Sequence, residues 1–151
     1  MSLRLDYRRI GAKALEALMG VEQYLEKTGL DPKLRGLIYL RASQINGCAF
    51  CVNMHYGELK KAGVPEAHIN LVSVWRESPC FSEKERAVLA WTETVTRLSE
   101  THVPDAEFER VRAQFTDAEL VDMTVSIAQI NVWNRLAVSF RAEPHMTAAG
   151  A

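Results

Sequence analysis

A Cys-x-x-Cys pair that directly follows a glycine constrains this chain more than any other part of its sequence. Gly47 can end a preceding helix, which would place Cys48 at the N-terminus of a new one. Successive side chains of a helix are rotated by about 100°. Cys48, Cys51 and His55 would therefore share one narrow stripe of the new helix. The remainder of the chain is then expected to act as a scaffold for a dithiol with a histidine beside it.

The position of the pair at a helix start favours thiol chemistry. Free backbone N–H groups and the positive end of the helix dipole stabilise a thiolate relative to a thiol. Two thiols at this spacing can close into a disulfide, and His55 follows Cys51 by one turn as a base for its proton. A structural interpretation stays open, because Leu59 continues the same stripe and both cysteines could be buried core residues.

A zinc site is the second alternative for this stripe. Cys48, Cys51 and His55 supply three ligands, whereas structural zinc requires four. The sequence contains no second Cys-x-x-Cys and no His-x-x-His. The remaining histidines are scattered along the chain at His68, His102 and His145. We therefore rank zinc below redox chemistry and predict neither a metal nor a cofactor.

The composition argues against several classes of function. Lys and Arg number 18 and Asp and Glu 19, and this near-neutral balance argues against nucleic acid or an anionic membrane as the main partner. No apolar run is long enough to span a bilayer, and charged residues interrupt the N-terminus where a signal peptide would be apolar. Three cysteines are too few for a secreted disulfide framework, and Cys80 is expected to be a free thiol. We therefore expect a cytoplasmic protein.

Helical periodicity and helix-capping signals run through the chain, and no segment has the period of a β-strand. The predicted helices cover about residues 6–27, 31–46, 48–61, 66–74, 82–98, 105–114 and 116–141. Capping boxes begin the two longest helices of the second half, at Ser82 and Thr116. We predict an all-α bundle of about six to seven helices. It would form a single domain over residues 1–151, with a core of about 5–142 and a mobile tail at 144–151.

The segment 41–55, which reads Arg-Ala-Ser-Gln-Ile-Asn-Gly-Cys-Ala-Phe-Cys-Val-Asn-Met-His, resembles the core motif of the AhpD-like alkylhydroperoxidases. These proteins belong to the carboxymuconolactone decarboxylase superfamily. The resemblance extends to Ala62-Gly63, to residues 81–93 and to residues 130–135, and so covers most of residues 5–142. It implies an all-helical subunit that assembles into dimers, trimers or hexamers.

The resemblance also implies roles for the motif residues. Cys51 would be the peroxidatic cysteine, which attacks a hydroperoxide. Cys48 would be the resolving cysteine, which receives electrons from a dithiol such as a lipoylated or thioredoxin-like protein. His55 would act in a proton relay with a glutamate on the preceding helix. The family usually has Arg-Glu-Leu where this chain has Arg35-Gly36-Leu37, so that glutamate is absent here.

The missing carboxylate makes other residues candidates for supporting the site. Glu85 and Glu93 are the predicted replacements for the relay glutamate, although His55 could also act without a carboxylate partner. Three further residues could line the pocket or be purely structural: Tyr39, Asn46 and Trp133.

From the motif and the resemblance we predict a thiol-dependent peroxidase that reduces hydrogen peroxide or organic hydroperoxides through a Cys48–Cys51 disulfide, in antioxidant defence. One alternative is a dithiol–disulfide oxidoreductase or redox sensor with weak peroxidase activity, which Gly36 favours. A less favoured alternative is a lyase like the carboxymuconolactone decarboxylases. The predicted partners are a hydroperoxide, a dithiol reductant and further copies of the same chain.

Overall fold

The structure is a computed structural model that describes residues 2–144. Within this range the chain forms nine α-helices, one 3₁₀ helix (η1) and no β-strand, which confirms the all-α prediction. The elements are α1 (Tyr7–Ile10), α2 (Ala12–Leu25), α3 (Pro32–Ile45), α4 (Ala49–Lys61), α5 (Glu66–Leu71), η1 (Val72–Glu77), α6 (Glu83–Thr96), α7 (Leu98–Thr101), α8 (Asp105–Arg112) and α9 (Asp117–Phe140). The predicted tail at 144–151 lies outside the described residues except for its first position.

Two predicted helices are divided in the structure. The segment 6–27 breaks at Gly11 into α1 and α2, and the break brings the ring of Tyr7 against that of Phe140, with centroids 5.3 Å apart. The segment 66–74 is α5 followed by the first residues of η1, which has a kink at Val74. The main-chain N–H of Arg4 also donates to the carbonyl of Phe140, so the N-terminal segment is attached to the end of α9.

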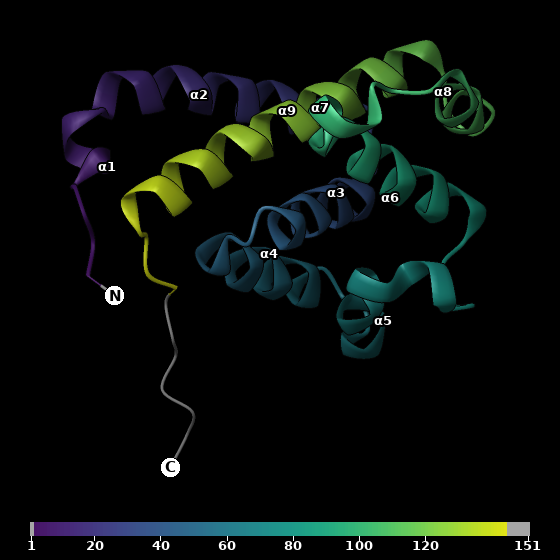
Figure 1. Ribbon diagram of the computed structural model, residues 1–151, viewed down its shortest axis with the longest axis horizontal. Coiled ribbons are helices and arrows are strands. Elements are labelled where there is room, and N and C mark those ends of the chain that lie inside the picture. Colours follow the sequence, from purple (N-terminus) through teal and green to yellow (C-terminus); the bar gives the residue numbers. More distant parts are fainter. Residues whose placement is uncertain (1, 145–151) are drawn as a thin grey trace.

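The α3 helix lies at the centre of the molecule and packs against α4, α6 and α9 (Figure 1). One group of buried side chains joins α3, α6 and α9, and includes Ile38, Val88 and Ile127. A second group joins α3 to α4, α5 and α6, and includes Leu37 and Leu59. α2 runs along the outer side of α9 (Figure 1), so that α2, α9 and the α3–α4 pair form successive layers.

Gly36 allows α3 and α4 to approach each other closely. A Cβ atom at this position would lie 2.6 Å from Cδ2 of Leu59, a distance that real Cβ atoms do not show. Leu59 is itself buried, at 2% exposure. The position that carries the relay glutamate in the AhpD-like motif is therefore used here for contact between two helices.

The junction between α3 and α4 has the geometry that the sequence predicts. Gly47 has a φ of +65°, in the left-handed region that glycine adopts without strain. The N–H of Cys48 donates to the carbonyl of Ser43 at 3.0 Å, and the N–H of Gly47 donates to that of Gln44 at 3.3 Å. This pair of bonds is a Schellman motif, which ends α3 and leaves Cys48 as the N-cap of α4.

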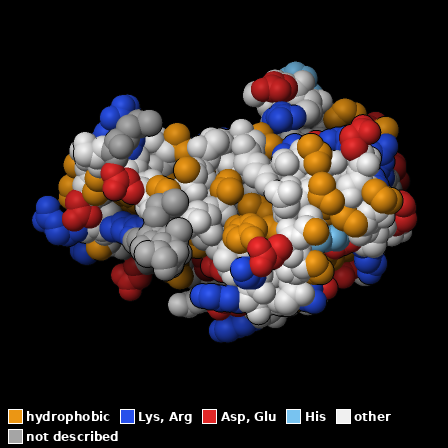
Figure 2. Space-filling model, turned by 90° about the horizontal axis from the view of Figure 1, so that it is seen from below, with side chains coloured by type: hydrophobic (Ala, Val, Ile, Leu, Met, Phe, Trp, Pro, Cys, Tyr) orange, Lys and Arg blue, Asp and Glu red, His pale blue; other side chains and the backbone are white. Residues whose placement is uncertain are grey.

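The surface carries charges of both signs. Figure 2 shows acidic and basic side chains interspersed with hydrophobic ones over the face seen from below. Large hydrophobic side chains are exposed on several helices: Ile10, Met19, Tyr24, Leu98, Val121 and Val138. No helix within residues 2–144 is long and apolar enough to cross a membrane.

Candidate active site

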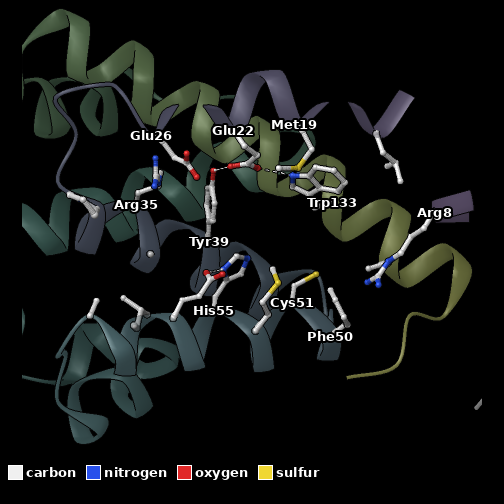
Figure 3. Close-up of a pocket in the computed structure, with 18 of the residues that line it drawn as sticks. Arg8, Met19, Glu22, Glu26, Arg35, Tyr39, Phe50, Cys51, His55 and Trp133 are labelled. Atoms are coloured by element: carbon white, nitrogen blue, oxygen red, sulfur yellow. Dashed lines mark hydrogen bonds and ion pairs between the residues drawn. The ribbon is translucent and has the colours of Figure 1, made fainter. Parts of the chain in front are cut away.

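A pocket of about 720 Å³ opens between α1, α2, α3, α4 and α9. Cys51 and His55 extend into it from α4 and lie one helical turn apart (Figure 3). Tyr39 of α3 and Trp133 of α9 line it from the other side. Most of the remaining wall is apolar and includes Leu15, Met19, Phe50, Met54 and Ala137. The α4 stripe predicted from spacing therefore faces a cavity as well as the core.

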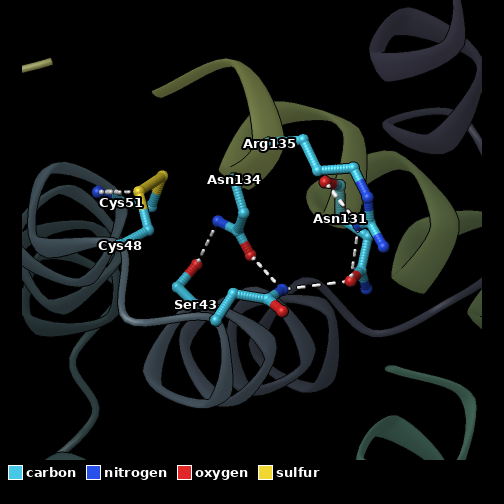
Figure 4. Close-up of a disulfide and its surroundings, with 7 residues drawn as sticks. Ser43, Cys48, Cys51, Asn131, Asn134 and Arg135 are labelled. Atoms are coloured by element: carbon cyan, nitrogen blue, oxygen red, sulfur yellow. Dashed lines mark hydrogen bonds between the residues drawn. A yellow bond between two sulfur atoms is a disulfide. The ribbon is translucent and has the colours of Figure 1, made fainter. Parts of the chain in front are cut away.

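Cys48 and Cys51 form a disulfide, with their Cα atoms 5.3 Å apart (Figure 4). Both residues are buried, at 1% and 2% exposure. Of the two cysteines, only Cys51 lines the pocket. Both belong to a small hydrophobic cluster with Ala137, against which Phe50 and Ala142 pack. A molecule in the pocket would therefore meet the sulfur of Cys51 first.

His55 has a carboxylate partner on its own helix. Its Nδ1 lies 2.7 Å from Oε2 of Glu58, and this hydrogen bond lowers the pKa of Glu58. A carboxylate accepts the Nδ1 proton, so Nε2 is the basic nitrogen of the neutral ring. Nε2 is buried and has no hydrogen-bond partner among the described residues. The ring of Tyr39 contacts the imidazole edge-on, with centroids 5.0 Å apart, and helps to hold its orientation.

Glu85 and Glu93, the predicted carboxylate partners of His55, are both engaged elsewhere. Glu85 closes the capping box with Ser82 and lies 3.0 Å from Nε2 of His68. It is not part of the pocket wall. The expectation that one of the two would contact His55 is therefore corrected, because α6 directs both side chains toward α5 and η1 rather than α4.

Glu93 belongs to a buried ion cluster that joins three elements. It accepts hydrogen bonds from Arg41 of α3 at 2.8 Å and from the indole of Trp75 at 2.9 Å, and it also pairs with Arg76. Burial by itself raises the pKa of Glu93, but the hydrogen bonds from Arg76 and Trp75 and the charge of Arg41 lower it overall. The cluster holds Glu93 ionised between α3, η1 and α6.

Tyr39 and Trp133 lie where the sequence predicts, on the pocket wall, and they share a partner. The hydroxyl of Tyr39 donates to one oxygen of Glu22 at 2.8 Å, and the indole N–H of Trp133 donates to the other at 2.7 Å (Figure 3). Burial, reinforced by the negative charge of Glu22, raises the pKa of Tyr39. Tyr39 is therefore a neutral phenol that fixes the position of a carboxylate in the pocket.

Asn46 does not line the pocket. Its amide donates to Oδ1 of Asn131 at 3.0 Å and to Oδ1 of Asn134 at 2.8 Å. The amide of Asn134 in turn donates to the hydroxyl of Ser43 at 3.0 Å. These bonds tie the turn before Cys48 to α9. Asn46 thus has the structural role that the sequence left open.

The geometry gives no support to the zinc site that was considered from the sequence, and Cys80 lies outside the pocket. Within residues 2–144, no three His, Cys, Asp or Glu side chains gather closely enough to hold a metal ion. Cys80 is an exposed free thiol with the hydroxyl of Ser78 3.0 Å from its sulfur.

Sequence reasoning missed two residues of the pocket that contact predicted ones. Glu58 follows His55 by three positions, which is the spacing of neighbours on a helix surface, so this pair was open to prediction. Glu22 is 17 residues from Tyr39 and 111 from Trp133 in the chain, and no local pattern indicates its contact with either.

The geometry agrees with comparisons to known proteins. The family model described as "Carboxymuconolactone decarboxylase family" matches residues 12–94, more than half of the chain. The chain belongs to the carboxymuconolactone decarboxylase family. Uncharacterized protein YdfG of Bacillus subtilis (strain 168) is 35% identical over 139 residues, which cover 92% of this chain and 95% of that protein.

Two solved structures place the chain among the AhpD-like members of the carboxymuconolactone decarboxylase family. ATU0492 of Agrobacterium tumefaciens, a protein of unknown function provisionally described as the antioxidant defence protein AhpD, is 48% identical with a TM-score of 0.94. The match covers 96% of this chain and 99% of that one. An uncharacterized peroxidase-related protein with an AhpD core, from Ralstonia eutropha JMP134, is 25% identical with a TM-score of 0.79, over 89% and 72% of the two chains. The resemblance read from the sequence motif is thereby confirmed.

Proposed function

We propose that this protein is a thiol-dependent peroxidase in which Cys51 attacks the hydroperoxide, Cys48 resolves the product and His55 carries the proton. The observation that carries the proposal is that Cys51 and His55 both line one pocket, whereas Cys48 does not. Membership of a family with AhpD-like, peroxidase-related structural neighbours supports the same reaction class.

The first step begins from the reduced dithiol. Nε2 of His55 takes the proton of the Cys51 thiol, and the thiolate attacks the terminal oxygen of the hydroperoxide. The O–O bond breaks, Cys51 becomes a sulfenic acid, and the leaving alkoxide receives the proton from the imidazolium to form an alcohol. Because Nε2 has no other hydrogen-bond partner among the described residues, it is free for both proton transfers.

The second step forms the disulfide seen in the structure. The Cys48 thiol loses its proton and its sulfur attacks the sulfenic sulfur of Cys51, which releases water. An external dithiol then donates two electrons and two protons, and restores both thiols. Both sulfurs are buried, so the reductant must be a small dithiol or a dithiol on a slender arm, such as a lipoyl group. This burial favours a peroxidase over an enzyme that exchanges disulfides with folded proteins.

Glu58 is proposed to take the place of the relay glutamate that is missing at Gly36. It holds Nδ1 of His55 at 2.7 Å, while its side chain is 58% exposed to solvent. A carboxylate in this position stabilises the imidazolium that forms when His55 accepts a proton. Its exposure gives a route by which protons exchange with water.

Consumption of peroxide tests the proposal directly. Wild-type protein, reduced with dithiothreitol and given cumene hydroperoxide, should turn over repeatedly, and Cys51→Ser should reduce the rate to that of dithiothreitol alone. Cys80→Ser is the matched control, because Cys80 is an exposed thiol outside the pocket, and it should behave as wild type. Equal rates for wild type and Cys51→Ser would refute the proposal.

We also propose that the chain forms a cytoplasmic homo-oligomer. Met19 and Tyr24 of α2 are 47% and 56% exposed, and Val121 and Val138 of α9 are 60% and 45% exposed. The proposal is that these side chains form part of a contiguous apolar surface that binds another subunit. Light scattering should give at least twice the chain mass of 17.0 kDa, and a clean monomer would contradict the proposal.

A further inference from the structure

The pocket is far larger than hydrogen peroxide requires. Its volume of about 720 Å³ lies within the range of roughly 300–1,000 Å³ typical of sites for drug-sized ligands. A water molecule, which is only slightly smaller than hydrogen peroxide, occupies roughly 30 Å³ of the liquid. A cavity of this size therefore fits a substrate with many carbon atoms.

The charges of the pocket are unevenly placed. Glu22, Glu26 and Arg35 lie together on one side of Figure 3, while Arg8 lies on the other side, beyond Phe50 from His55. The wall around Cys51, between these two ends, is mostly apolar. The pocket thus has an apolar middle and two charged ends of different character.

Arg8 and Arg35 are the two cations among the residues that line this pocket. The guanidinium of Arg8 lies over the ring of Phe50, 5.1 Å from the centroid, and 5.9 Å from that of Tyr7. None of the ion pairs among the described residues includes Arg8 or Arg35. Arg35, by contrast, lies close enough to Glu58 for its charge to lower the pKa of that carboxyl. A ligand anion would therefore be attracted to the Arg8 end.

We propose that the substrate is an organic hydroperoxide with a bulky hydrocarbon body and a carboxylate, an inference that rests on the proposed function. The hydrocarbon would lie along the apolar wall, and the carboxylate would pair with Arg8. The hydroperoxide group would then lie between the sulfur of Cys51 and the unpartnered Nε2 of His55, as the first step of the reaction requires. The products are the corresponding hydroxy acid and, after resolution by Cys48, water.

The test compares four peroxides with dithiothreitol as reductant: hydrogen peroxide, cumene hydroperoxide, linoleic acid hydroperoxide and its methyl ester. The kcat/KM for the organic peroxides should exceed that for hydrogen peroxide by about tenfold or more, a factor that roughly two buried methylene groups supply. The acid should exceed its ester by about fivefold, which is typical of one partly exposed ion pair. Added salt should reduce this second ratio.

Arg8→Gln should bring the ratio of acid to ester close to one. Arg9→Gln is the matched control, because the Arg9 side chain is 80% exposed and pairs with Asp6 outside the pocket, and it should keep the wild-type ratio. A hydrogen peroxide rate equal to the organic rates, or an acid-to-ester ratio that Arg8→Gln leaves unchanged, would overturn the inference while leaving the peroxidase function intact.

A binding measurement separates this inference from the chemistry. Linoleate, which has no peroxide group, should bind to Cys51→Ser and quench the fluorescence of Trp133 on the pocket wall. Arg8→Gln in the same background should weaken this binding about fivefold. If linoleate binds in this way but no peroxide is consumed, the proposed function fails and the inference about the ligand stands. If linoleate does not bind, the inference fails.

Discussion

Glu58 reaches His55 from the following turn of α4, whereas the resemblance implies a glutamate on the preceding helix. The change is linked to Gly36, because a Cβ atom at that position would lie 2.6 Å from Cδ2 of Leu59, so any larger residue requires Leu59 to move. The imidazole keeps a carboxylate partner, but the partner stands at the solvent-exposed side of the pocket. The proton relay is thus expected to exchange with water more readily than one that is fully enclosed.

Glu58→Gln should lower the rate of peroxide consumption roughly tenfold or more, because an amide cannot stabilise an imidazolium as a carboxylate does. Initial rates with cumene hydroperoxide and dithiothreitol measure the effect. Glu66→Gln is a suitable control, since Glu66 pairs with Lys60 and Tyr56 away from the pocket. Equal losses in the two variants, or none in either, would contradict the role of Glu58.

The residues of the site differ in how far sequence alone could identify them. Cys48, Cys51 and His55 follow from helical spacing within one segment. The role of Glu22 depends on how α2 packs beside α3 and α9, which is a tertiary property. The choice of Glu85 and Glu93 was wrong for the same reason, because periodicity does not say which neighbour a helix face meets.

Among the secondary-structure elements, it is the turn between α3 and α4 that positions Cys48 and Cys51. The Schellman motif at Gly47 ends α3, and the amide of Asn46 attaches the same turn to α9. Cys48 consequently starts α4 with Cys51 one turn further, facing the pocket. A change of backbone at this turn should therefore affect both stability and the placement of the sulfurs.

Gly47→Ala should lower the free energy of unfolding by about 1–2 kcal/mol, because an L residue with a Cβ is strained in the left-handed region. Gly20→Ala should have the opposite effect and raise the free energy of unfolding by up to about 1 kcal/mol, since its Cβ would meet open space within α2. Urea denaturation of the three proteins measures both changes. A Gly47→Ala variant as stable as wild type would show that the turn does not depend on the glycine.

Helix boundaries were predicted well where a capping signal marks them. Ser82 and Thr116 are N-caps with complete capping boxes, as expected. The break at Gly11 was missed, because a single glycine within a periodic apolar pattern is tolerated by many helices. In the folded chain this break accompanies the stacking of Tyr7 on Phe140 of α9.

At the scale of the whole molecule, the cluster around Glu93 connects the central helix to η1 and α6. Because the pKa of Glu93 is lower in the folded chain than the ordinary 4.5, the unfolded chain binds the proton more tightly. The stabilisation is complete above about pH 4.5 and is lost as the pH falls through the folded-state pKa. Acid should therefore lower the free energy by which this cluster stabilises the packing of the central helix against η1 and α6.

Glu93→Gln should lower the free energy of unfolding at pH 7 by about 3 kcal/mol, the lower end of the cost of breaking a buried ion pair, because Arg76 is partly exposed. The difference from wild type should shrink as the pH falls below 4.5 and Glu93 of the wild type is protonated. Urea denaturation at several pH values measures this. A difference that is constant with pH would contradict the assignment.

The all-α class follows from periodicity, but the pocket does not. Its wall is built from α1, α2, α3, α4 and α9, which are adjacent only in the folded molecule. Its volume and the placement of Arg8 depend on how α1 and α2 meet the end of α9. These are the features from which the proposed substrate class is derived.

The central claim is that Cys51, and not Cys48, reacts with the hydroperoxide. It is tested most directly by treating reduced Cys48→Ser and Cys51→Ser with one equivalent of cumene hydroperoxide and locating the added oxygen by tandem mass spectrometry. We predict rapid formation of a sulfenic acid on Cys51 in Cys48→Ser, and no comparable oxidation of Cys48 in Cys51→Ser. Rapid oxidation of Cys48 in Cys51→Ser, with Cys51 unmodified in the other variant, would contradict the claim.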